Sequence, residues 1–177
     1  TMDYTDEIRK RRTFAIISHP DAGKTTLTEK FLLFGGAIQV AGAVKSNKIR
    51  KSTASDFMDI ERQRGISVAT SVLGFDYNGL KINLLDTPGY LDFTGEVKGA
   101  LRVVDAAVVL LKAVEGAEVG TDIVWRYAQE GDAAAIVVVN KVDQENADVD
   151  RVIEQAKESL GYPTQKPLGI LRRLIAV

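Results

Sequence analysis

Short apolar runs alternate with longer amphipathic stretches along this chain, a pattern typical of an α/β sheet protein. Strands are expected at residues 13–17, 66–75, 80–85, 106–111 and 133–139, and helices at residues 26–34, 92–103, 118–130 and 147–160. Tyr77-Asn78-Gly79 predicts a tight hairpin turn between the second and third strands, which makes them antiparallel neighbours. The pattern therefore predicts a mostly parallel central sheet with one antiparallel hairpin strand and helices on both faces.

Polar loops follow three of the predicted strands directly. They cover residues 18–25, 86–89 and 140–143. In open α/β sheets, ligands bind in the crevice outside the carboxyl ends of the strands. We therefore expect a ligand site where these loops meet. A fourth loop, at residues 37–64 with a local helix at 55–63, is so long that it is either functional or disordered.

The first loop has the spacing of a phosphate-binding loop, with Ser18 in place of the usual first glycine. Gly23 permits a tight curl whose N–H groups converge on phosphate oxygens, and the following helix N-terminus favours their negative charge. Lys24 can reach the terminal phosphates and the Thr25 hydroxyl can ligate Mg²⁺. The alternative is an ordinary turn with a surface lysine. The candidate nucleotide-binding residues here are His19, Pro20, Asp21, Ala22, Gly23, Lys24, Thr25 and Thr26.

The second loop, Asp86-Thr-Pro-Gly89, has residues that a nucleotide hydrolase needs beside its phosphate loop. Asp86 can hold Mg²⁺ through water, and the Gly89 N–H can sense a γ-phosphate. A strand-end turn built on Pro-Gly is the alternative, and it would be favoured if this loop stood alone. Together with the phosphate loop, it favours a nucleotide site.

The third loop, Asn140-Lys-Val-Asp143, has the form Asn-Lys-x-Asp. The Asp143 carboxylate can accept two hydrogen bonds, from N1–H and from the exocyclic amine of guanine, and adenine cannot supply both. Asn140 can bind the base edge and brace the phosphate loop, while the stem of Lys141 covers the ring. An ATP-dependent kinase or ATPase fits the phosphate loop but not this motif, which selects GTP and GDP.

The amino-acid composition excludes several classes of protein. The 177 residues carry a net charge of -1, which argues against a dedicated nucleic-acid coat or a polybasic membrane binder. The absence of cysteine and the single histidine exclude disulfides, thiolate sites and histidine-rich metal centres. No apolar run approaches the roughly 18 residues of a membrane span. We expect a soluble, cytoplasmic protein that uses neither a membrane nor DNA as a partner.

These motifs together resemble the GTP-binding (G) domain of bacterial translation factors, a P-loop NTPase fold. Residues 11–30, 33–39 and 53–67 are similar to the class II peptide-chain release factor, the third bacterial release factor, and that resemblance is dense over residues 8–89. Residues 90–161 are more similar to elongation factor G and its paralogues. We therefore interpret the chain as a composite of two related factors, whether natural or artificial.

The resemblance implies a GTP-binding switch domain that hydrolyses GTP to GDP and phosphate with Mg²⁺ and signals to the ribosome. Residues 37–67 correspond to the first switch, with Ser67 at a Mg²⁺-ligating position, and residues 86–96 to the second. The ribosome, both its RNA and its proteins, is the implied partner. The basic segment 45–51 either approaches ribosomal RNA or is a solvated loop; the sequence weighs the two equally.

Tyr90 is the main departure from the family, which usually has histidine after Asp-Thr-Pro-Gly to position the attacking water. A phenol is a poor base near neutral pH, since its unperturbed pKa is about 10. The catalytic candidates are therefore Tyr90, Lys24 and Gly89, with slow or absent hydrolysis expected. The alternative function is a fragment that binds guanine nucleotide without useful turnover.

The end of the chain is the second departure. We expect a GTP-binding domain over residues 1–161 and an atypical tail at 162–177, with the domain truncated and its base pocket loosened. Pro167-Leu-Gly169 is faintly similar to translation factors. Residues 162–167 are also similar to a motif of amino-group DNA methyltransferases, which we interpret as chance or as a trace of a composite chain.

Overall fold

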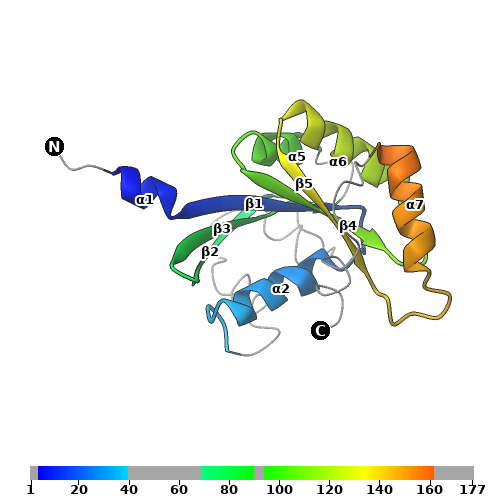
Figure 1. Ribbon diagram of the computed structural model, residues 1–177, viewed down its shortest axis with the longest axis horizontal. Coiled ribbons are helices and arrows are strands. Elements are labelled where there is room, and N and C mark those ends of the chain that lie inside the picture. The colour runs from blue at the N-terminus through cyan, green and yellow to red at the C-terminus, as the bar shows by residue number, and fades with distance from the viewer. Residues whose placement is uncertain (1–3, 40–68, 90–93, 162–177) are drawn as a thin grey trace.

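The computed structural model describes residues 4–39, 69–89 and 94–161. Its elements follow the alternation of strands and helices that the sequence predicts (Figure 1). The strands are β1 (Arg11–Ser18), β2 (Ser71–Tyr77), β3 (Leu80–Asp86), β4 (Ala106–Lys112) and β5 (Ala134–Asn140). The helices are α1 (Thr5–Arg9), α2 (Lys24–Phe34), α5 (Thr94–Leu101), α6 (Val119–Glu130) and α7 (Val149–Leu160).

The five strands form one mixed sheet in the order β2-β3-β1-β4-β5. β1 lies in the centre and is parallel to β3 and β4, while β5 is parallel to β4. β2 is antiparallel to β3, and their turn has positive φ at Asn78 (49°) and Gly79 (75°), as a tight hairpin requires. The predicted α/β class and the single antiparallel pair are confirmed.

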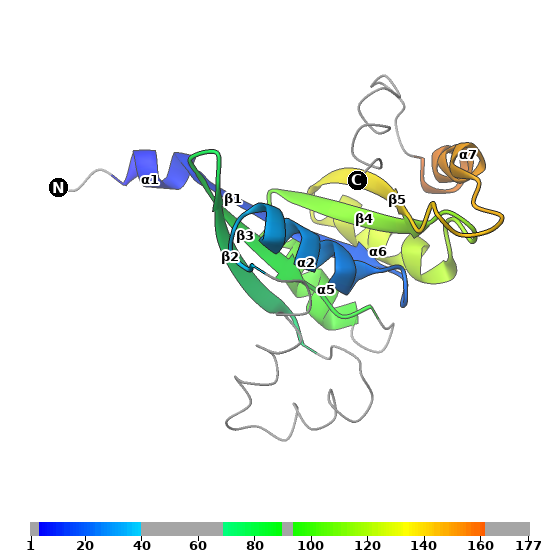
Figure 2. The same cartoon turned by 90° about the horizontal axis from the view of Figure 1, so that it is seen from below.

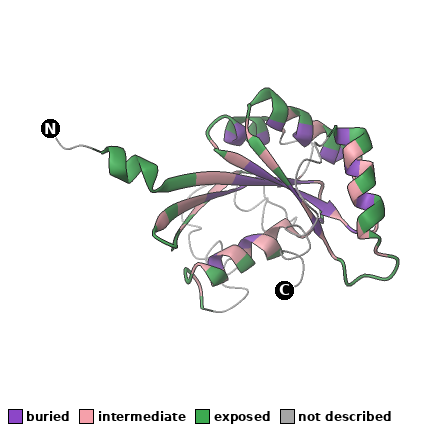
Figure 3. Ribbon diagram, viewed as in Figure 1, coloured by how far each residue is buried: buried purple, intermediate pink, exposed green. Residues whose placement is uncertain are grey.

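The two faces of the sheet bury alternate residues of each strand, because successive side chains point to opposite sides. On one face, Ala15 and Ile17 of β1 join a large apolar cluster with α5, α6 and α7. On the other face, Phe14 and Ile16 pack with α2. Figures 1 and 2 show α2 across the sheet from α5 and α6, and Figure 3 shows the buried positions along the central strands. Helices on both faces are therefore confirmed.

Element boundaries differ from the prediction at several ends. β2 begins at Ser71 rather than at residue 66, and α2 begins two residues early, at Lys24. α7 begins at Val149 because the Asp148 carboxylate accepts a 2.9 Å hydrogen bond from the Arg151 N–H and so caps the helix. α1 was not predicted, since none of its five residues is buried and it leaves no apolar pattern.

The predicted local helix at residues 55–63, and all of the long loop beyond residue 39, lie outside the described residues. Within the described part, no helix combines the length and apolar character needed to cross a membrane.

Candidate functional site

Three predicted site segments begin at one edge of the sheet. β1 ends at Ser18, β3 at Asp86 and β5 at Asn140. Because these strands are parallel, their carboxyl ends share the edge, and each is followed there by its polar loop. The sheet therefore brings together loops that are far apart in the sequence.

The phosphate loop curls through two residues with left-handed backbone. Asp21 has φ of 60° and Gly23, the residue before α2, has φ of 94°. Asp tolerates this region better than most residues, whereas Gly adopts it without steric cost. A Cβ at position 23 would also press against the amide nitrogen of Asn140. Gly23 is thus required by both its conformation and its surroundings.

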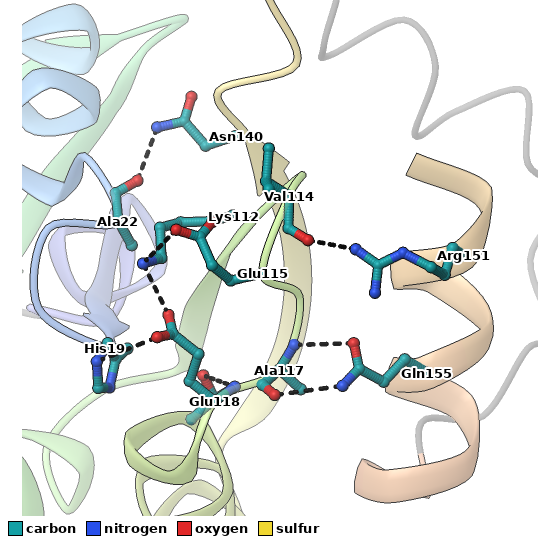
Figure 4. A network of polar contacts seen from close by, with 11 residues as sticks. His19, Ala22, Lys112, Val114, Glu115, Ala117, Glu118, Asn140, Arg151 and Gln155 are labelled. Atoms are coloured by element: carbon teal, nitrogen blue, oxygen red, sulfur yellow. Dashed lines mark hydrogen bonds and ion pairs between the residues drawn. The ribbon is translucent and has the colours of Figure 1, made fainter. Parts of the chain in front are cut away.

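Asn140 joins the third loop to the phosphate loop. Its amide nitrogen donates a 2.9 Å hydrogen bond to the carbonyl oxygen of Ala22, whose side chain is buried (Figure 4). This is the brace that the sequence analysis predicts. Lys141, the next residue, has φ of 58°, and Asp143 is exposed to solvent. The contacts of these three residues with a base stay predictions.

The Asp86 turn lies against the phosphate loop as well. Asp86 is buried and pairs in register with Ile16 of β1, while the hydroxyl of Thr87 donates a 2.8 Å hydrogen bond to the Ile16 carbonyl. A Cβ at Gly89 would lie 3.3 Å from Lys24 Nζ and 3.4 Å from the Cα of Pro20. Gly89 therefore lies beside the lysine that is predicted to reach the terminal phosphates.

His19 of the phosphate loop contacts the segment after β4, a contact that the sequence analysis missed. Its Nε2 lies 3.3 Å from Oε1 of Glu118, and the other oxygen of Glu118 lies 3.0 Å from Nζ of Lys112 (Figure 4). Lys112 also pairs with Glu115 at 3.1 Å. Glu118 precedes α6, and its N–H donates to the Thr121 hydroxyl at 3.3 Å. The spacing of Glu118 and Thr121 is a signal of a helix start, and it indicates that Glu118 precedes α6.

The pairing of Lys112 and Glu115 shifts the pKa of both groups. Burial acts to lower the pKa of Lys112, but hydrogen bonds to Glu118 and Glu115 outweigh burial and raise it above its ordinary value. The hydrogen bond from Lys112 holds the pKa of Glu115 below its ordinary value. Both shifts favour the charged forms of the pair.

The same segment is fastened on its other side to α7. The side-chain amide of Gln155 accepts from the Ala117 N–H at 3.2 Å and donates to the Ala117 carbonyl at 3.3 Å (Figure 4). Arg151 donates to the Val114 carbonyl. Residues 113–118, which we call the β4–α6 loop, are therefore held between α7 and the phosphate loop.

Several candidates lie outside the described residues: Ser67, Tyr90, the basic segment 45–51 and the tail 162–177. Among the residues that the structure does describe, no group of three or more His, Asp or Glu side chains is arranged to hold a metal ion. The donors predicted for Mg²⁺ are instead Thr25, in the first turn of α2, and Asp86 at the end of β3. Both offer oxygen, which Mg²⁺ prefers.

The sequence of this chain matches a known protein family over most of its length. A model of the elongation factor Tu GTP-binding domain matches residues 9–172. Peptide chain release factor 3 of Symbiobacterium thermophilum is 48% identical over 168 residues, which cover 93% of this chain and 32% of that protein. Peptide chain release factor 3 of Streptococcus pyogenes is 46% identical over 174 residues, covering 97% and 34%.

A crystal structure of a protein from Thermus thermophilus is similar in fold as well, with a TM-score of 0.72 and 36% sequence identity. The match covers 85% of this chain and 22% of that one. This chain spans about a third of the length of the release factors that it matches. The similarity to release factor 3 runs over nearly the whole chain, including the part beyond Gly89 that the sequence analysis compares with elongation factor G.

Proposed function

Because the chain belongs to the family of elongation factor Tu-type GTP-binding domains and is homologous to peptide chain release factor 3, we propose that it hydrolyses GTP to GDP and phosphate as the switch domain of a cytoplasmic, ribosome-associated translation factor. The observation that carries this proposal is that the second and third polar loops both contact the phosphate loop. Asn140 donates to Ala22, and Gly89 lies beside Lys24. A phosphate loop, a γ-phosphate sensor and a base-reading motif are thereby joined at one edge of the sheet.

The phosphates of the nucleotide are bound by the phosphate loop and by the first turn of α2. The N–H groups at the start of an eleven-residue helix point at the bound anion, and the helix dipole favours its charge. Lys24 Nζ contacts the terminal phosphates, and the Gly89 N–H donates to the γ-phosphate. Gly89 has no side chain to separate Lys24 from the ligand, which supports this arrangement.

The residues that would hold Mg²⁺ are Thr25 through its hydroxyl, Asp86 through a water, and Ser67. A hydroxyl from the first turn of α2 and a carboxylate from the end of β3 suit a hard cation that keeps several waters. When bound there, the ion would supply positive charge to offset that of the β- and γ-phosphates. Asp86 is buried at the end of β3, so its carboxylate is held in a fixed place by the sheet.

The guanine base is recognised by Asn140, Lys141 and Asp143. The exposed Asp143 carboxylate accepts from N1–H and the exocyclic amine, and the Lys141 stem covers the ring. Asn140 contributes twice, because its amide oxygen stays available to the base while its nitrogen donates to Ala22.

Hydrolysis proceeds by attack of water on the γ-phosphorus as the bond to the bridging oxygen of GDP breaks. Tyr90 follows Gly89 directly and orients this water through its hydroxyl, with a slow rate because a phenol is a weak base near neutral pH. The alternative, a guanine-nucleotide-binding fragment with little turnover, is favoured by this same tyrosine. Contact with the ribosome is proposed from the family alone. The chain spans only about a third of the length of its relatives, so their remaining parts are not represented here.

One titration tests nucleotide class and site together. Fluorescent GDP, GTP and ATP analogues are titrated against the wild type, Lys24→Ala and the control Lys30→Ala, which removes an exposed lysine from the same helix. We expect tight binding of both guanine analogues, weak binding of the ATP analogue, and loss of affinity only in Lys24→Ala. Equal binding of ATP and GTP, or no loss with Lys24→Ala, would overturn the proposal.

Phosphate release with and without ribosomes then separates the enzyme from the binding fragment. Release that ribosomes accelerate supports a translation-factor GTPase. Nucleotide binding with no release under either condition supports the alternative.

A further inference from the structure

The phosphate loop is held by two side chains that come from outside it. The first is Asn140, which donates to the Ala22 carbonyl. The second is Glu118, whose Oε1 lies 3.3 Å from His19 Nε2. The two contacts flank Asp21, a non-glycine residue of the phosphate loop that has left-handed backbone, with φ of 60°. A residue in this region is held there by its surroundings rather than by its own preference.

The two nitrogens of the His19 ring have different surroundings. Nδ1 is buried without a hydrogen-bond partner among the described residues, and it faces Gly120 in the first turn of α6. Nε2 is therefore the ring nitrogen that faces a partner, since it lies 3.3 Å from Oε1 of Glu118. The ring thus has one productive contact, and Glu118 supplies it.

Glu118 is itself fixed in place. Its Oε2 accepts from Lys112 at 3.0 Å, and its N–H is bonded to the Thr121 hydroxyl at the start of α6. Ala117, the preceding residue, is clamped through its N–H and carbonyl by Gln155 of α7. Because Lys112 holds its carboxylate and the neighbouring contacts hold its backbone, Glu118 can restrain the ring that it contacts.

We propose that Glu118 is a positioning residue for the phosphate loop and that it acts through His19. This role rests on the proposed function, because it concerns how firmly the loop keeps its phosphate-binding curl. Glu118 holds one end of the loop, as Asn140 holds the other, so that the N–H groups between them stay directed at the phosphates.

A double-mutant cycle on the rate of GDP dissociation tests this role. A fluorescent GDP analogue is chased from the 177-residue chain carrying Glu118→Ala, His19→Ala, or both. We expect each single variant to release GDP roughly tenfold faster, the size expected for one hydrogen bond to a charged group. The double variant should be no faster than either single one, because both remove the same contact.

Glu118→Gln and Gly120→Ala separate positioning from a loss of stability. Gln keeps an acceptor for His19, so it should restore most of the slow dissociation. In Gly120→Ala, the new Cβ would lie 2.6 Å from His19 Nδ1 and displace the ring while leaving Glu118 unchanged. It should speed dissociation although alanine favours a helix. Gly99→Ala, whose Cβ would meet nothing within 4 Å, is the matched control and should not.

The dissociation experiment distinguishes failure of the positioning role from failure of the proposed function. If the wild type does not bind the GDP analogue, the proposed function and this role both fail. If the wild type binds it but the variants dissociate at the wild-type rate, only the positioning role fails. Additive effects of Glu118→Ala and His19→Ala would likewise overturn it, since Glu118 would then act without His19.

Discussion

Asn140 lies 118 positions from Ala22 in the chain, yet its amide nitrogen donates a 2.9 Å hydrogen bond to the Ala22 carbonyl oxygen. This bond connects the end of β5 with the phosphate loop that follows β1, across the strand β4 that separates them. The motif proposed to read the base therefore shares a side chain with the loop proposed to hold the phosphates. A substitution of Asn140 should therefore affect both the base-reading motif and the phosphate loop.

Asn140→Ala should lower the free energy of unfolding by about 1 kcal/mol, because the Ala22 carbonyl loses its side-chain donor. Urea unfolding of the chain without nucleotide measures this loss. The control is Gln144→Ala, an exposed position in the loop after β5. Equal stability of the two variants would mean that the bond contributes nothing to the fold.

Gly23→Ala should be more harmful than the same change at Gly36. Both glycines have positive φ, 94° and 70°, so alanine is strained at each by roughly 1 kcal/mol. Only at position 23 does the new Cβ also press against the Asn140 amide, whereas at position 36 nothing lies within 4 Å. Thermal unfolding should therefore show a clearly lower Tm for Gly23→Ala. Equal shifts in Tm would contradict the crowded contact.

Local chemistry explains which parts of this architecture were predictable. The hairpin follows from Asn78-Gly79, since two adjacent residues that accept positive φ specify a two-residue turn. The site edge follows from polar motifs placed directly after apolar strands. Each of these features depends on a few neighbouring residues, so a linear pattern is enough to predict it.

The bond from Asn140 to Ala22 was predicted from its motif, but other contacts between distant segments were not predictable in this way. Glu118 and His19 are about a hundred residues apart, and neither belongs to a motif that names the other. No role was predicted for Thr87, yet its hydroxyl donates to the carbonyl of Ile16 in the central strand. Such pairs depend on the order of the strands in the sheet, which hydrophobic periodicity does not specify.

Asp143→Asn should exchange nucleotide specificity. The amide can accept only at its oxygen and brings a donor to where guanine presents another, so binding of GTP should fall by roughly a hundredfold, or about 3 kcal/mol. A xanthine base presents a carbonyl there and should bind better to the variant than to the wild type. Competition of GTP and xanthosine triphosphate against a fluorescent GDP analogue measures both effects. Glu145→Gln, an exposed change in the same loop, should alter neither.

Tyr90→His should hydrolyse GTP faster in a single turnover, because imidazole titrates near neutral pH and phenol does not. Tyr90→Phe removes the hydroxyl and should be slower than the wild type. Nucleotide affinity should be alike in all three chains, which separates catalysis from binding. Identical single-turnover rates for wild type and Tyr90→His would end the argument that this position limits turnover.

The Lys112–Glu115 pair should make stability depend on pH at both extremes. The pKa of Glu115 is lowered in the folded state by the hydrogen bond from Lys112, so its contribution is present above its unfolded pKa of about 4.3 and is lost as pH falls through the folded pKa. The pKa of Lys112 is raised, since its bonds to Glu118 and Glu115 outweigh burial. Its contribution is therefore present below its unfolded pKa of about 10.4 and is lost as pH rises through the folded pKa.

Glu115→Gln tests the acid side of this dependence. In urea, the free energies of unfolding of the variant and the wild type should differ at pH 7, by a small amount because the Glu115 side chain is 43% exposed. The difference should shrink as the pH is taken down to about 3. Glu158→Gln, an exposed change on α7, corrects for the general loss of a carboxylate. A difference that stays constant from about pH 7 to about pH 3 would show that the contact, and not the charge of Glu115, is what stabilises the β4–α6 loop.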